Sequence, residues 1–235
     1  MDFLYRYHTK IKHSDLDMRD MLAPWCILEL FQEAAYLHVN NEEAGYQEML
    51  LKNALWVLIS VRIDFFSEPD EEICVTTWQL RRGRAEFIRD YLIESNGKKV
   101  ATGSSKWCLI DKDTRRILPT SLIPTDISGE YIEVNQINKI NFESLEKTSE
   151  LVKVEKSMID HNFHMNNCHY ARWIYNSIEL NGGKIKTFEI SFLNEAVLGD
   201  EIELRSERQD NYWFIEGYKN NKICFKARVE VENAL

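Results

Sequence analysis

Hydrophobic and polar residues change their spacing several times along the chain, and each change predicts a different element. Residues 24–40 carry apolar side chains around most of a helical circumference, which is typical of a buried helix. Residues 42–52 predict a second, shorter helix. Four following segments have strand character, at residues 54–66, 72–80, 85–95 and 98–110. Asn96-Gly97, between the last two, is the strongest short signal for a β-hairpin.

The second half of the chain repeats this order. A strand-like segment at 150–158 leads through an irregular stretch to a predicted helix at 167–180, which Asn181-Gly182-Gly183 should end. Four further strand-like segments follow, at residues 184–193, 200–209, 211–219 and 222–232. Residues 14–31 align without gaps on residues 157–174 and place Asp17 opposite Asp160.

Two copies of a long buried helix beside an antiparallel sheet predict an α+β fold. Two separate β-sandwiches are the alternative, which the long apolar helix in each half disfavours. Between the halves the regular pattern stops, in a stretch that contains Pro119 and Pro124 and many Ser, Thr and Asn residues. We therefore expect an N-terminal unit at 1–112, a linker at 113–149 and a C-terminal unit at 150–235.

The composition of the chain excludes some classes of function and favours others. The chain has 235 residues and a formal net charge of −9, which argues against general binding of nucleic acid. None of its five cysteines forms a CxxC pair, so we expect free thiols in a reducing compartment. The first residues lack a signal-peptide pattern, and no apolar run has the length of a membrane span. These features favour a cytoplasmic protein.

The polar residues before the second long helix carry the candidate chemistry. Asp160, Asn162 and His164 alternate, so in extended backbone they would share one face and His161 would point away. A carboxylate, an amide and an imidazole together suit hydrolysis of an activated ester, which needs proton transfer and a donor to the oxyanion. Taken singly, such residues could only shape a turn.

Two further features point to the same place. A helix beginning near Asn167 would offer free N–H groups and the positive end of its dipole. Glu195 ends a strand in an apolar context, where a carboxylate is either paired or functional; it could orient His164 or activate water. In the first half Arg19 and Met21 stand opposite Asn162 and His164. Only the second half is therefore expected to catalyse, with Asp17 as a structural residue.

Residues 160–167, with Tyr170, resemble the D-x-N-x-H-x-N-N-x-x-Y block of the acyl-acyl-carrier-protein (acyl-ACP) thioesterases. The resemblance covers nearly the whole chain and implies a tandem, or double, hotdog fold. It implies catalytic roles for Asp160, Asn162, His164 and Glu195. Plant members usually carry a cysteine directly after this glutamate, where this chain has Ala196. A cysteine nucleophile at that position is excluded, and attack by water is favoured.

The resemblance also implies the substrate: a fatty acyl chain on acyl carrier protein, released as free fatty acid in fatty acid biosynthesis, without a metal or organic cofactor. The residues expected to bind the substrate are Asn166, Asn167, Trp25, Leu28, Phe31, Trp56, Leu58 and Phe65. The six apolar ones would line a tunnel for the acyl chain, although each of them taken singly is better explained as core. The residues expected to contact the acidic carrier are Arg81, Arg82 and Arg84, unless they are an ordinary solvated hairpin end.

Other functions remain open at this point. A hotdog hydrolase of acyl-coenzyme A would use the same residues, and a non-catalytic acyl-binding protein or a dehydratase would share the fold. His161, His164 and His169 lack the spacing of a zinc site. Both a monomer and a homodimer are compatible with the sequence.

Overall fold

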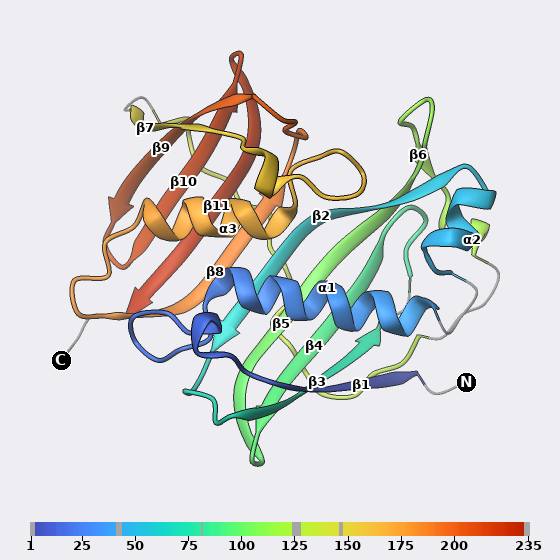
Figure 1. Cartoon of the computed structure of the whole chain (residues 1–235), viewed down its shortest axis with the longest axis horizontal. Coiled ribbons are helices and arrows are strands. Elements are labelled where there is room, and N and C mark those ends of the chain that lie inside the picture. Colours follow the sequence, from blue (N-terminus) through green and yellow to red (C-terminus); the bar gives the residue numbers. More distant parts are fainter. Residues whose placement is uncertain (1–2, 41–43, 81, 124–127, 146–147, 233–235) are drawn as a thin grey trace.

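A single antiparallel sheet of eleven strands runs through both halves of the chain (Figure 1). The computed structural model describes residues 3–40, 44–80, 82–123, 128–145 and 148–232. The strands of the first half are β1 (Leu4–Lys10), β2 (Ala54–Phe65), β3 (Glu72–Gln79), β4 (Phe87–Ser95), β5 (Lys98–Asp111) and β6 (Ile117–Leu118). Those of the second half are β7 (Thr148–Lys153), β8 (Lys184–Phe192), β9 (Glu201–Gln209), β10 (Tyr212–Lys219) and β11 (Lys222–Glu232).

The strand order shows the internal repeat. It runs β1-β3-β4-β5-β2 in the first half and, from the opposite edge, β7-β9-β10-β11-β8 in the second, with β6 paired to β5. The halves join where β2 pairs with β8, from Ser60 opposite Ser191 to Asp64 opposite Thr187. Because this junction is a backbone ladder, loops of the two halves are held at fixed positions relative to each other.

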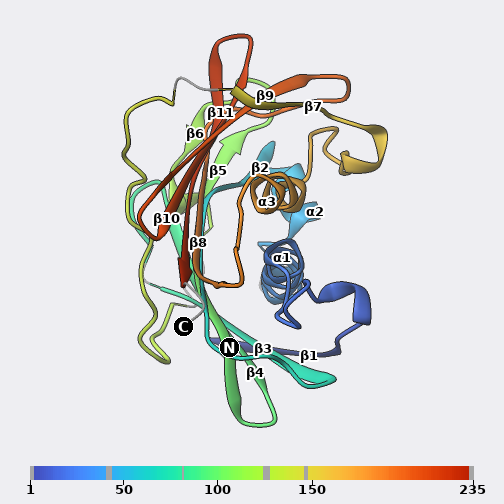
Figure 2. The same ribbon diagram turned by 90° about the vertical axis from the view of Figure 1, so that its left-hand side faces the viewer.

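The helices α1 (Pro24–Asn40) and α3 (Asn167–Asn176) lie side by side on one face of the sheet (Figures 1 and 2). Pro24 suits the first helical position because its missing N–H would have no partner there. Phe31 of α1 stacks on Tyr91 of β4 with ring centroids 4.0 Å apart. Gly103 of β5 lies directly beneath Phe31, where a Cβ would collide with the ring. The helix is therefore seated close to the sheet.

The segment 128–145 runs over the opposite face of the sheet and contacts both halves (Figure 2). Val134 packs there with Trp78 and Leu92, and Gln136 donates a hydrogen bond to Asp90 at 3.1 Å. Both faces of β4 are consequently buried. The predicted linker thus holds this cover and the short strand β6, while the boundaries proposed for the three units remain a prediction.

Most predicted elements agree with the structure, and two differ. The prediction of 24–40 as a helix is confirmed, and 42–52 contains α2 (Tyr46–Leu51). Asn96 and Gly97 both have positive φ, at 47° and 74°, as the predicted hairpin requires. The helix predicted to reach residue 180 ends at Asn176. The residues after it are irregular, and in that conformation Ile178 and Leu180 are buried in the core. The strand predicted at 150–158 stops at Lys153.

The described residues include no helix long and apolar enough to cross a membrane.

Candidate active site

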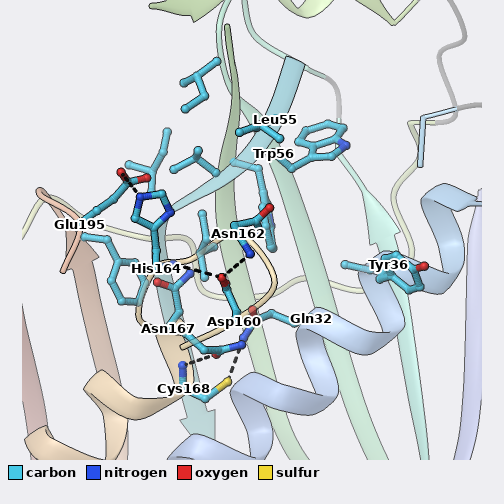
Figure 3. Close-up of a pocket in the computed structure, with 18 of the residues that line it drawn as sticks. Gln32, Tyr36, Leu55, Trp56, Asp160, Asn162, His164, Asn167, Cys168 and Glu195 are labelled. Carbon is cyan, nitrogen blue, oxygen red and sulfur yellow. Dashed lines mark hydrogen bonds and ion pairs between the residues drawn. The ribbon is translucent and has the colours of Figure 1, made fainter. Parts of the chain in front are cut away.

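A cavity of about 1110 Å³ lies between α1, the first residues of β2, the loop 160–167 and the end of β8 (Figure 3). Its polar residues include Asp160, Asn162, His164 and Glu195, the four residues predicted to catalyse. Apolar residues of the sheet line another part, among them Leu55, Trp56, Leu58, Phe87, Trp107 and Ile110. The cavity therefore combines a cluster of titratable groups with an apolar wall, as ligand sites usually do.

The Asp160–His164 segment is a tight turn, so the argument that Asp160, Asn162 and His164 share one face of an extended backbone is wrong. The Asp160 N–H donates to the His164 carbonyl at 2.9 Å, and Phe163 has a left-handed φ of 63°. The Asp160 carboxylate points back into the turn, where Oδ1 accepts the N–H groups of Asn162 at 2.8 Å and His164 at 3.4 Å. An Asp side chain that bonds backbone two residues on favours a turn over extended chain.

His161 is also placed differently from the prediction, because the turn brings it into the cavity wall. Its ring meets Tyr46 of α2 edge-on, with centroids 4.9 Å apart. The Tyr46 hydroxyl lies 3.5 Å from Oδ1 of Asn162, at the outer limit of a hydrogen bond. Within the described residues, no three His, Cys, Asp or Glu side chains are grouped so that they could hold a metal ion.

His164 and Glu195 form the central contact of the site. Nε2 of His164 lies 3.1 Å from Oε2 of Glu195, and the two side chains are 30% and 42% exposed. Figure 3 shows the His164 ring between Glu195 and Asn162. The other carboxylate oxygen of Glu195, Oε1, pairs with the guanidinium of Arg115. The Lys219 ammonium donates to the Glu195 carbonyl oxygen at 2.9 Å and so fixes the backbone of the same residue.

The start of α3 borders the cavity through Asn166 and Asn167. Asn166 is the N-cap: its Oδ1 accepts the Cys168 N–H at 2.9 Å, so one of the N–H groups expected to be free is used within the helix. Gln32 of α1 lies 2.9 Å from the Cys168 sulfur. Burial, with a contribution from the Glu29 carboxylate, raises the pKa of the Cys168 thiol far above its ordinary value. This thiol is therefore a packing group.

Only two of the six apolar residues predicted to line an acyl tunnel, Trp56 and Leu58, border the cavity. Leu28 and Phe31 are buried in the core between α1 and the sheet, and Phe65 packs against that core. Trp25 meets Tyr175 of α3 edge-on at 5.3 Å. The apolar patterns of α1 and β2 indicated that these residues are buried, but they could not separate the face toward the core from the face toward the cavity.

The residues predicted to contact a carrier protein are not equivalent. Arg82 donates to the carbonyl oxygens of Ile123 at 2.5 Å and Thr120 at 3.4 Å, and it therefore holds the chain after β6. Arg84 is exposed. Arg81 lies outside the described residues.

Several residues of the first half that border the cavity were missed, among them Gln32, Tyr46 and Arg115. Arg115 follows a polar Asp-Lys-Asp-Thr stretch that signals a turn, but nothing in that stretch indicates Glu195 as its partner. The separation of the two residues, 80 positions, explains why local pattern could not find the contact.

The fold and the site together define a double-hotdog protein with a His–Glu pair and an Asn at the wall of a partly apolar cavity. Residues 2–131 match the family described as the acyl-ACP thioesterase N-terminal domain, and residues 143–233 match its C-terminal domain. The chain belongs to the acyl-ACP thioesterase family.

Solved structures agree on the fold. An acyl-ACP thioesterase from Bacteroides thetaiotaomicron superposes with a TM-score of 0.89 at 21% identity, covering 97% of this chain and 98% of the other. The 12:0-ACP thioesterase from Umbellularia californica gives 0.84 at 17% identity, covering 100% and 99%. The double hotdog fold is thereby confirmed.

The curated relatives that the chain matches are longer than this chain. The chloroplastic oleoyl-acyl carrier protein thioesterase 2 of Arabidopsis thaliana is 23% identical over 86% of this chain and 62% of its own length. The chloroplastic palmitoyl-acyl carrier protein thioesterase of the same plant is 25% identical, over 82% and 52%. This chain thus spans between half and two thirds of the length of these relatives.

Proposed function

We propose that the protein hydrolyses the thioester between a fatty acyl chain and acyl carrier protein, releasing free fatty acid. The observation that carries this proposal is the His164–Glu195 pair, which stands with Asn162 at the wall of a cavity of about 1110 Å³ in a chain of this family. A cavity of that size, apolar on one side, suits an acyl chain. The relatives named above are thioesterases of acyl-ACP by name.

His164 serves as the general base in this proposal. If Nε2–H donates to Glu195, the other ring nitrogen, Nδ1, carries no hydrogen and can accept a proton from water. The water oxygen then bonds to the thioester carbon, and the C–S bond breaks when the tetrahedral intermediate collapses. The proton on His164 passes to the departing sulfur, so the products are a carboxylic acid and the thiol of the carrier. Glu195 stabilises the imidazolium between the two transfers.

The developing oxyanion needs donors at fixed positions. The side-chain amide of Asn162 and the amide groups of Asn167, at the N-terminus of α3, border the same cavity and supply them. The helix dipole adds positive potential at that point. Asp160 contributes through the turn, because its carboxylate holds the N–H groups of Asn162 and His164.

The acyl chain would lie along the sheet side of the cavity. Trp56 and Leu58 of β2 line that side, and Phe87 and Ile110 continue the wall. Arg84 is the exposed residue that we retain as a candidate contact for the acidic carrier. A reducing compartment such as the cytoplasm remains a prediction, to which five free thiols are suited.

The test is release of free fatty acid from palmitoyl- and octanoyl-ACP, measured beside the matching coenzyme A thioesters. His164→Ala should lower kcat about 10²- to 10⁴-fold. His13→Ala is the matched control, because it removes an exposed histidine that does not border the cavity. It should leave kcat unchanged. Equal or faster hydrolysis of the coenzyme A thioesters would assign the protein to that substrate class. Absence of hydrolysis by the unmodified protein would overturn the proposal.

A further inference from the structure

The hairpin between β5 and β6 is a rigid element that belongs to the first half of the chain. Oδ1 of Asp111 accepts the Thr114 N–H at 2.7 Å and the Thr114 hydroxyl at 2.8 Å. The Asn53 side chain, at the start of β2, donates to the carboxylates of Asp111 and Asp113 at 3.2 and 2.9 Å. These contacts fix the hairpin tip against the strand that also joins the two halves.

Arg115 sits in this tip in an unusual backbone conformation. Its φ is 59°, in the left-handed region that residues with a Cβ rarely adopt. Its N–H donates to the Asp111 carbonyl at 2.9 Å, so the surrounding hairpin holds it in place. A conformation of this kind persists where its surroundings over-determine it, and it often occurs at functional positions.

The Arg115 side chain crosses from the first half to the second and ends on Glu195. It pairs with Oε1, while Oε2 faces Nε2 of His164. Both carboxylate oxygens are therefore engaged, one by each half of the molecule. Without Arg115, Oε1 would be left to solvent, and the partly exposed Glu195 side chain would be free to rotate away from His164.

We propose that Arg115 is a positioning residue for catalysis, which the first half supplies to the reaction site of the second. It acts through Glu195, by fixing the carboxylate that orients His164, and it does not bind the substrate. This inference rests on the proposed thioesterase function. A His–carboxylate pair must be held close to its productive geometry, and a displacement of about 1 Å can cost on the order of 100-fold in rate.

The primary test compares Arg115→Met with Arg116→Met in the full chain. Arg116 is an exposed neighbour in the same hairpin whose side chain forms no ion pair among the described residues, so its variant controls for loss of charge and of hairpin stability. Arg115→Met should lower kcat about 10- to 100-fold with KM for acyl-ACP little changed, and Arg116→Met should match the unmodified protein. Arg115→Lys should recover part of the loss.

A double-mutant cycle separates positioning from substrate binding. In a Glu195→Gln background, Arg115→Met should have little further effect on single-turnover rates, because its partner is already removed. A loss that persists in this background, or that appears in KM alone, would show that Arg115 contacts the substrate and would overturn the inference. Equal rates for Arg115→Met and the unmodified protein would also overturn it. If the unmodified protein releases no fatty acid, it is the proposed function that fails.

Discussion

Asp17 and Asp160 hold the same turn in the two halves of the molecule. The Asp17 N–H donates to the Met21 carbonyl at 2.8 Å, as the Asp160 N–H does to the His164 carbonyl at 2.9 Å. Oδ1 of Asp17 accepts the N–H groups of Arg19 at 2.8 Å and Met21 at 3.2 Å, the positions equivalent to Asn162 and His164. The half that lacks the Asn and His side chains thus keeps the turn, which identifies the backbone role of Asp160.

The shared turn predicts that the two aspartates contribute equally to stability, while only Asp160 contributes to activity. Asp17→Ala and Asp160→Ala should each lower the free energy of unfolding by about 1–2 kcal/mol, because two backbone N–H groups lose their acceptor. Only Asp160→Ala should also lower kcat, since its turn carries Asn162 and His164. Chemical denaturation and fatty acid release would measure both quantities. An equal loss of kcat in Asp17→Ala would contradict this assignment.

Cys168 should be dispensable for catalysis. Burial raises the pKa of its thiol, so the thiol stays protonated at neutral pH and is a poor nucleophile. Cys168→Ala should therefore keep kcat within about threefold of the unmodified protein, a change of less than about 1 kcal/mol in the barrier. The folded protein should also react slowly with maleimide at this position. A loss of activity as large as that of His164→Ala would contradict this and make Cys168 a candidate nucleophile.

Arg84 and Arg82 should respond differently to charge reversal. Arg84→Glu should raise KM for acyl-ACP about two- to tenfold, as expected for an exposed charge at an interface, and leave KM for acyl-coenzyme A unchanged. Arg82→Glu should instead lower the melting temperature, because the guanidinium bonds the carbonyls of Thr120 and Ile123. An unchanged KM for acyl-ACP in Arg84→Glu would exclude this residue as a carrier contact.

Asp90 should make stability fall as pH rises from the acid range. The residue is 1% exposed, and burial raises the pKa of its carboxyl despite hydrogen bonds from Ser104 and Gln136. The folded protein therefore holds this proton more tightly than the unfolded chain. The resulting stabilisation is fully present below the ordinary Asp pKa of about 3.9 and is lost as pH rises through the folded value.

Asp90→Asn tests this sign directly, because an amide of the same shape does not titrate. The variant should be more stable than the unmodified protein at pH 7, and the two should converge as the pH approaches about 4. Denaturation at a series of pH values would measure the difference. A difference that stays constant across the series would show that Asp90 does not titrate as described.

Several features were readable from the sequence because they depend on neighbours along the chain. The apolar pattern of 24–40 predicts a helix and Asn96-Gly97 predicts a turn with two positive φ angles, and both were confirmed. The helix is buried on one side only, because Glu29, Glu33 and Tyr36 are exposed. The repeat that places Asp17 opposite Asp160 indicated two copies of one fold, and the strand orders of the two halves agree with it. The motif at 160–167 likewise identified the residues that the structure gathers at one cavity.

Contacts between distant segments could be decided only by the tertiary structure. Pairing of β2 with β8 brings Arg115 to Glu195 and Tyr46 to Asn162, across 80 and 116 positions. The seating of α1 over Gly103 is a second example. It decides which apolar side chains of the helix face the core and which residues face the cavity. Periodicity determines that a side chain is buried, because that follows from local geometry, whereas its neighbours follow from the packing of the whole chain.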